Sequence, residues 1–161
     1  MPIQKLRQFL DDNHVKYIVI SHSKAYTSQG IAATANISGN ELAKSVMLKR
    51  DGELCMAVLP APKHVDLARF AKLTNCKEIA LASERDFRDR FPDCEVGAMP
   101  PFGNLYGLPV YVDVSLTRDK EIAFNAGSHL ELVKLAYEDF ERLAKPQIME
   151  FAAPLATRHV A

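Results

Sequence analysis

Apolar residues recur along this chain with two spacings, one typical of helices and one typical of strands. A spacing of three or four residues places Ile3, Leu6 and Leu10 on one face and predicts a first helix over residues 3–13. Runs rich in β-branched and aromatic residues, such as VKYIVIS at 15–21, predict strands. The same patterns predict further helices at 27–36, 63–75, 83–91 and 137–144, and further strands at 78–81, 108–116, 121–127 and 130–135.

The strongest local signal is a hairpin in AKSVMLKRDGELCMAVLPA, residues 43–61. Its two apolar arms flank Asp51-Gly52, a preferred pair for a type I′ turn. Because nearly every position in both arms is apolar, we expect both faces to be covered and the hairpin to lie at the centre of a sheet. Hairpins interspersed with helices predict an α+β fold with a mixed sheet.

Length, composition and charge narrow the function classes. The 161 residues suit a single domain, and the formal net charge of zero argues against non-specific coating of nucleic acid. The cysteines, Cys55, Cys76 and Cys94, form no CxxC pair, and Cys55 is predicted to be a buried small hydrophobe. No apolar run approaches the roughly 20 residues of a membrane span. These features predict a soluble, cytoplasmic protein.

Lys44 stands out because it opens the apolar run SVMLK. If this run is a strand, Lys44 shares a face with Val46 and Leu48. A lysine on an apolar face is costly unless its ammonium reaches a partner or a pocket. The alternative is a lysine at the strand end that extends to water.

The stretch VGAMPPFGNL, residues 96–105, is an uncharged apolar loop. Pro100 and Pro101 lack backbone donors and fix φ, while Gly97 and Gly103 allow conformational freedom on either side. Such a preset loop suits the wall of a small pocket or a cradle for an oxyanion. The alternative is a structural crossover packed on the core.

A second candidate element is the turn in FNAGSH, where Gly127 permits a tight bend between two strands. The turn would place Asn125, Ser128 and His129 near a sheet end, although His129 is also compatible with a plain exposed turn histidine. The histidines lack metal-ligand spacing, and GxSxG, Walker A and GxGxxG motifs do not occur. We therefore expect neither a bound metal nor a cofactor.

Three segments in this order, ELAKSVMLK with GELCMAVLPA, then VGAMPPFG, then DKEIAFNAGSH, resemble one family. It is the YbaK/prolyl-tRNA-synthetase-associated editing domain family, the trans-editing aminoacyl-tRNA deacylases. The resemblance covers roughly residues 5–146. It implies a single compact α+β domain with a barrel-like mixed sheet surrounded by helices. We expect the domain to occupy residues 1–146, followed by a tail at 147–161 that is either docked or disordered.

The resemblance also implies roles for the site residues. Lys44 would orient the tRNA end or the ester, and Gly127 and His129 would complete the catalytic group, although some family members lack the histidine. The implied substrate-binding residues are Gly97, Ala98, Met99, Pro100, Pro101, Phe102, Gly103, Asn125 and Ser128.

The implied function is that of a freestanding deacylase of mischarged tRNA, with tRNA for proline carrying Ala, Ser, Thr or Cys as the expected substrate. Partners would be the acceptor end of aminoacyl-tRNA and prolyl-tRNA synthetase, with no DNA or membrane. Because the net charge is zero, tRNA binding needs either a local basic cluster or delivery by a synthetase. Candidates for the cluster are Lys44, Lys49, Arg50, Lys63, Arg69, Lys72 and Lys77.

The alternative function is a non-catalytic module that binds a small ligand or a nucleotide end. The amino acid removed and the oligomeric state stay open.

Overall fold

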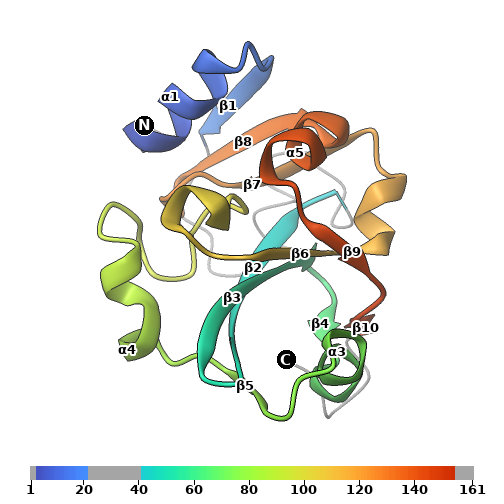
Figure 1. Cartoon of the computed structure of the whole chain (residues 1–161). Coiled ribbons are helices and arrows are strands. Elements are labelled where there is room, and N and C mark those ends of the chain that lie inside the picture. The colour runs from blue at the N-terminus through green and yellow to red at the C-terminus, as the bar shows by residue number, and fades with distance from the viewer. Residues whose placement is uncertain (1–2, 22–40, 155–161) are drawn as a thin grey trace.

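The computed structural model describes residues 3–21 and 41–154 (Figure 1). Its helices are α1 (Gln4–Asp12), α3 (Leu67–Thr74), α4 (Glu84–Phe87) and α5 (Tyr137–Ala144). Its strands are β1 (Tyr17–Ser21), β2 (Ala43–Arg50), β3 (Glu53–Pro60), β4 (His64–Val65), β5 (Ile79–Leu81), β6 (Val110–Asp113), β7 (Glu121–Asn125), β8 (Glu131–Ala136), β9 (Gln147–Met149) and β10 (Ala152–Ala153). Short 3₁₀ turns cover Arg88–Arg90, Gly103–Tyr106 and Val114–Arg118. Within the described residues these elements confirm the predicted helices and strands, and the helix predicted at 27–36 lies outside them.

The predicted hairpin is the centre of the larger sheet. Asp51 and Gly52 both have positive φ, 51° and 84°, as a type I′ turn requires. The register runs from Ala43 opposite Pro60 to Arg50 opposite Glu53. The strand order is β5-β2-β3-β6-β9, with β3–β6 and β6–β9 parallel and the other pairs antiparallel. This mixed sheet confirms the expected topology.

A second, antiparallel sheet, β1-β8-β7, lies above the first in Figure 1. The two sheets meet through one isolated parallel bridge, Leu42 to Ala123. The largest core cluster fills the space between them, and Phe102, Phe124 and Phe140 are buried in it. The architecture is therefore the predicted barrel-like α+β domain, although its sheets do not close into a continuous barrel.

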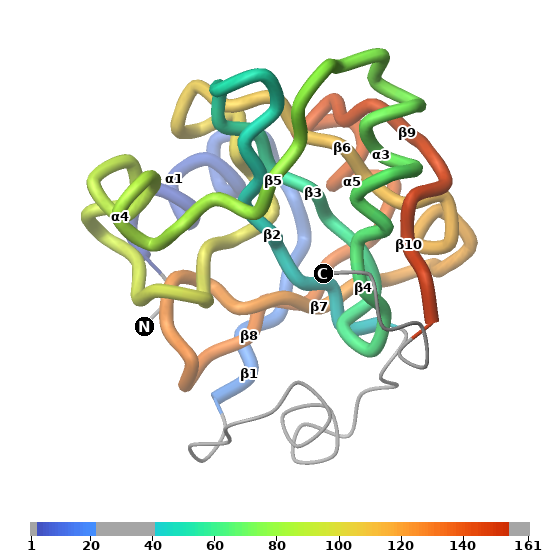
Figure 2. The backbone as a smooth tube through the Cα atoms, turned by 90° about the horizontal axis from the view of Figure 1, so that it is seen from below, coloured from blue at the N-terminus to red at the C-terminus, as the bar shows by residue number. Residues whose placement is uncertain are grey.

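Both faces of the hairpin are covered, as predicted. Met47, Met56 and Val58 point into the large core, whereas Leu48 and Leu59 point to a second cluster beneath α3. Figure 2 shows α3 running beside β3. The C-terminal strands close this second cluster, because the Phe151 ring packs edge-to-face on Phe70 of α3 at 5.3 Å between centroids.

The strand predicted at 108–116 ends earlier than expected, at Asp113, because the Asp113 carboxylate caps the following turn. One carboxylate oxygen accepts from the backbone N–H and the hydroxyl of Ser115. The other accepts from the N–H groups of Phe151 and Ala152 at 2.9 and 2.8 Å. Asp113 is buried, so these bonds offset its desolvation and tie the C-terminal segment to β6.

Candidate functional site

The loop that starts at Glu95 and the turn around Gly127 bind each other through their backbones. The N–H of Glu95 donates to the Gly127 carbonyl at 2.8 Å, and the N–H of Gly127 donates to the Ala98 carbonyl at 2.9 Å. Ala98 N–H donates in turn to the Glu95 carbonyl at 3.0 Å. We call residues 95–98 and 127–129 the loop–turn clasp. It brings together two of the three segments that the sequence singled out.

Glycine is required at two positions of the clasp. Gly127 has φ +91°, and a Cβ there would lie 2.4 Å from Cγ2 of Ile3, at the start of α1. Gly97 has φ +83°, and a Cβ there would lie 3.4 Å from the His129 ring. Any other residue would therefore adopt a strained left-handed backbone at both positions, and at Gly127 its Cβ would also clash with Ile3.

Both the backbone and the ring of His129 are held by hydrogen bonds to the loop. Its backbone N–H donates to Oε2 of Glu95 at 3.2 Å, and its Nε2 lies 2.8 Å from the carbonyl oxygen of Val96. Because a carbonyl can only accept, Nε2 carries the proton and Nδ1 is the nitrogen left for another partner. The neighbouring Ser128 hydroxyl accepts from the N–H of Leu130 at 3.1 Å, which tightens the turn.

Lys44 and Asn125 hold equivalent positions on two parallel strands. One isolated bridge pairs Leu42, the residue before β2, with Ala123 of β7, and Lys44 and Asn125 each come two residues later. Since side chains two residues apart on a strand point to the same side, Lys44 and Asn125 share one side of the sheet junction. The bridge is isolated, and the turn of the clasp begins at Gly127, two residues after β7 ends at Asn125.

Polar atoms at this junction lack partners. The Asn125 side-chain oxygen and the Ser45 hydroxyl are buried without a hydrogen bond. Lys44 is half-buried, and among the described residues none forms a hydrogen bond or an ion pair with it. Burial lowers the pKa of Lys44 below its usual 10.5. Unpaired buried polar groups are rare in proteins, so Lys44 and Asn125, which share one side of the junction, are candidates for ligand binding, whereas Ser45 points to the other face of β2.

The loop after the clasp is anchored in the core. Residues 98–103 are all buried, and the Phe102 ring packs edge-to-face on Phe9, Phe124 and Phe140 at 5.5–5.8 Å. A Cβ on Gly103 would lie 3.2 Å from Val110. The loop is thus both a packed crossover at its end and part of the clasp at its start. Among the described residues, the N–H groups of Gly97 and Met99 have no acceptor.

A model of the aminoacyl-tRNA editing domain family matches residues 22–143 of this chain. The chain belongs to this family. It is therefore an aminoacyl-tRNA editing domain, as the three sequence segments predicted, and a hydrolase acting on aminoacyl-tRNA esters.

Individual relatives agree with this assignment. The multifunctional Ser/Thr-tRNA deacylase ProXp-y of Escherichia coli K12 is 28% identical over 153 residues, which is 92% of this chain and 91% of the relative. A crystal structure described provisionally as a trans-editing enzyme for prolyl-tRNA synthetase superposes with a TM-score of 0.81 at 18% identity, covering 93% of this chain and 96% of the other. A hypothetical protein of solved structure superposes with a TM-score of 0.83 at 17% identity, covering 93% and 100%. The two structures show that the fold is shared.

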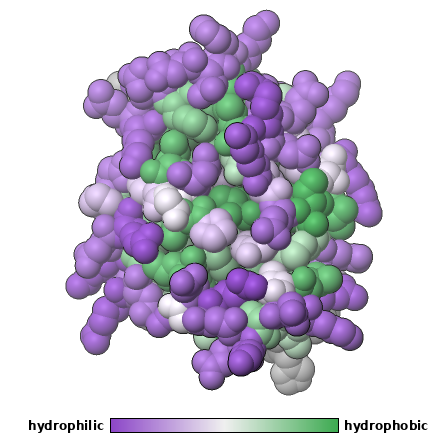
Figure 3. All heavy atoms as spheres, viewed as in Figure 1, coloured by the Kyte–Doolittle hydropathy of each residue, from purple (hydrophilic) through white to green (hydrophobic). Residues whose placement is uncertain are grey.

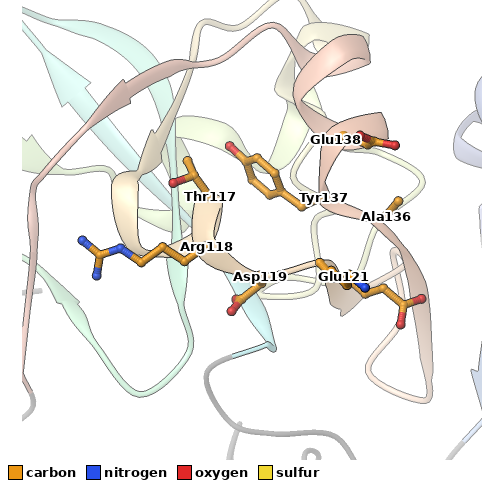
Figure 4. Close-up of a pocket in the computed structure, with 8 residues that line it drawn as sticks. Thr117, Arg118, Asp119, Glu121, Ala136, Tyr137 and Glu138 are labelled. Atoms are coloured by element: carbon orange, nitrogen blue, oxygen red, sulfur yellow. The ribbon is translucent and has the colours of Figure 1, made fainter.

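The editing domain also has surface cavities away from this junction. The one drawn in Figure 4, of about 590 Å³, lies between the 3₁₀ turn at 114–118 and the start of α5. Two others, of about 470 and 570 Å³, flank the hairpin turn and share Lys49 and Gly52. None of these three includes Lys44, the loop at 97–103 or the turn at 125–129. The face in Figure 3 is mostly hydrophilic, with smaller hydrophobic areas across its middle.

Other reactive side chains form no second centre in the described part of the domain. Cys55 is buried, as predicted, and burial raises its pKa to about 11. Burial also raises the pKa of Cys94 to about 11, so both are neutral thiols near neutral pH. Residues 3–21 and 41–154 contain no group of three metal-binding side chains, and no helix there has the length and apolar character of a membrane span.

Glu95 is the site residue that the sequence analysis missed. Its backbone N–H and carbonyl both belong to the clasp, and its carboxylate accepts from the His129 N–H and lies 4.0 Å from Nε2 of the same ring. Nothing in the run DCEVG distinguishes this carboxylate from a solvated surface acid. Only its contacts with the turn at 127–129, which is distant in the sequence, single it out.

The predicted basic cluster divides between the two faces of the hairpin. Lys49 points to the α4 side, where its ammonium lies 3.5 Å from the Asp86 carboxylate. Arg50 points to the opposite side and donates to the Thr74 carbonyl of α3 at 2.6 Å. Lys49 therefore does not share a face with Arg50 and the cations of α3, and the expected cluster is smaller than the sequence suggested.

Proposed function

We propose that this editing domain is a freestanding deacylase that hydrolyses the ester of tRNA carrying a small wrong amino acid. Serine and threonine are the first candidates, because the Escherichia coli relative is a Ser/Thr-tRNA deacylase. Alanine and cysteine are the further candidates on tRNA for proline. The observations that support the proposal are the bridge that gives Lys44 and Asn125 equivalent positions, and the backbone bonds that hold the loop–turn clasp directly after β7.

The reaction needs little from the protein because an aminoacyl ester is already activated. A water oxygen bonds to the carbonyl carbon, the bond from that carbon to the ribose oxygen breaks, and a water proton passes to the ribose oxygen. The neighbouring ribose hydroxyl can relay this proton. The developing negative charge on the carbonyl oxygen is the part that the protein must stabilise.

In this proposal Lys44 supplies the positive charge and the clasp supplies backbone donors. The N–H groups of Gly97 and Met99 are free among the described residues and suit an oxyanion. Asn125 offers an amide that has no protein partner for its oxygen. Pro100 and Pro101 form a stiff wall that limits the size of the bound amino acid, with Phe102 and Gly103 holding it from the core side.

Glu95 and His129 act as positioning residues. Their contacts fix the clasp on β7, and the Nε2 proton of His129 is already donated to Val96. Glu95→Gln keeps the shape but weakens the charge-assisted bond to the His129 N–H, so we expect a several-fold loss in kcat with little change in thermal stability. A large loss of stability without a specific loss in kcat would make Glu95 a purely structural residue.

The test is a deacylation time course with the purified protein. The substrates are tRNA for proline charged with Ala, Ser, Thr, Cys or Pro, and serine and threonine on their own tRNAs. We expect at least one of the Ser and Thr esters on tRNA for proline to be hydrolysed and Pro-tRNA to stay intact. If tRNA or its amino acid binds and every ester survives, the binding-module alternative replaces the enzyme.

Prolyl-tRNA synthetase is the proposed second partner, since a chain with zero net charge has little long-range attraction for tRNA. If it delivers the substrate, adding the synthetase should lower the KM for mischarged tRNA. An unchanged KM would argue that the editing domain binds tRNA unaided.

A further inference from the structure

Positive charge is concentrated in one short segment of this neutral chain. Residues 63–77 contain four cations, Lys63, Arg69, Lys72 and Lys77, and one carboxylate, Asp66, a net charge of +3. The rest of the chain therefore carries −3. Asp66 is committed to the helix, because its carboxylate caps α3 by accepting from the N–H of Arg69 at 3.1 Å.

This segment runs along the whole hairpin, from the Lys44 end to the turn end. Lys63 N–H donates to the carbonyl of Pro60, which pairs with Ala43 beside Lys44. At the other end, Arg50 beside the turn donates to Thr74, the last residue of α3. The eight residues of α3 span about 12 Å, so the segment leads directly away from Lys44.

Arg69, Lys72 and Lys77 are exposed and Lys63 is half-buried, and most of these cations are unpaired among the described residues. Arg69 and Lys72 are exposed on one face of α3, and Phe70 is buried on the other. Arg69 lies 3.9 Å from the Glu150 carboxylate, and both side chains are largely exposed. Lys63 and Lys72 have no ion pair with any described residue. Lys77 follows the helix near the Asp51 carboxylate, which accepts from the N–H groups of Lys77 and Glu78.

We infer that Lys63, Arg69 and Lys72 form a phosphate-binding track for the acceptor stem of the tRNA whose ester is bound at Lys44. The inference rests on the proposed function for the location of the ester. The RNA must leave the junction in some direction, and this segment is a cationic path that starts there. A 12 Å track matches about three or four phosphates along one strand of a duplex.

The test compares Lys63→Gln/Lys72→Gln with a matched control, Lys16→Gln/Lys120→Gln. The control lysines are exposed and directly precede β1 and β7, which belong to the second sheet, whereas α3 packs on the first. Binding of uncharged tRNA is measured by fluorescence anisotropy at several salt concentrations. We expect the track variant to weaken binding about tenfold at low salt and to reduce the log–log salt slope by about two. The control should change the affinity less than twofold.

Unchanged tRNA affinity and salt slope in the track variant would overturn the track. Equal losses in the track and control variants would also overturn it, since binding would then depend on total charge. The outcome is independent of turnover, because the tRNA is uncharged. A wild-type protein that binds tRNA through the track and hydrolyses no ester would contradict the proposed function and leave the track standing. If the variant lost only synthetase binding, the segment would be a protein-binding surface instead.

Discussion

The two ends of the β2–β3 hairpin differ in how their polar groups are satisfied. At the turn end, the Asp51 carboxylate accepts two backbone N–H groups, Lys49 pairs with Asp86, and Arg50 donates to Thr74. The Nε of Arg50 is the exception, since it is buried without a partner. The polar groups at this end therefore hold the hairpin turn against α3 and α4.

At the open end, next to the junction with β7, the pattern is reversed. Lys44 has no partner among the described residues, and the polar side-chain oxygens of Ser45 and Asn125 are buried and unbonded. An unsatisfied buried polar group costs about 1–3 kcal/mol. We propose that stability is sacrificed for binding at this end of the hairpin, as is common at functional sites.

Substitution of two glycines should produce the largest difference between the turn end of the hairpin and the junction. A Cβ added to Gly52 in the turn would meet open space, whereas a Cβ on Gly127 at the junction would lie 2.4 Å from Ile3. We expect Gly127→Ala to lower the free energy of unfolding by about 3 kcal/mol and to abolish deacylation. Gly52→Ala should cost about 1 kcal/mol and leave deacylation intact. Urea unfolding and a deacylation assay measure both, and equal activity in the two variants would contradict the contrast.

A second test replaces an unsatisfied polar group by an apolar one of similar size. Asn125→Leu removes the unbonded oxygen, so we expect the free energy of unfolding to rise by about 1 kcal/mol while kcat/KM falls about tenfold. The counterpart is Asp51→Asn, which should lower stability and leave kcat/KM unchanged. Loss of stability in Asn125→Leu without loss of activity would assign Asn125 a structural role.

A smaller effect concerns pH. Burial lowers the pKa of Lys44 below 10.5, so the folded protein loses this charge at a lower pH than the unfolded chain does. If the charge is required, kcat/KM corrected for spontaneous hydrolysis should fall as pH rises through that lowered pKa. As pH rises over the same range, the folded protein no longer carries the cost of burying the charge. The free energy of unfolding therefore rises while kcat/KM falls. The residual activity of Lys44→Arg should lack this alkaline decrease, and an identical decrease in both proteins would assign it to another group.

The sequence predicted those parts of the fold that depend on local rules. The Asp51-Gly52 turn and the apolar arms of the hairpin follow from short-range patterns, and the structure contains both. The sequence also singled out Lys44, the proline-containing loop and the Asn-Ala-Gly turn as separate candidates.

Long-range pairing accounts for what the sequence did not predict. The clasp joins Glu95 to Gly127 through backbone bonds that no side-chain pattern encodes. The role of Asp113 depends on the distant N–H groups of Phe151 and Ala152. The opposite orientations of Lys49 and Arg50 follow from strand alternation, but their partners, Asp86 and Thr74, depend on how α3 and α4 pack.

The most direct test of the central role of Lys44 compares Lys44→Ala with Lys49→Ala in a deacylation time course on Ser- and Thr-charged tRNA. Both substitutions remove a cation from the same strand, but only Lys44 lies at the junction. We predict that Lys44→Ala lowers kcat by about 10²–10³ and that Lys49→Ala changes it less than twofold. Equal turnover by wild type and Lys44→Ala would contradict the central role of Lys44, even if the enzyme itself were confirmed.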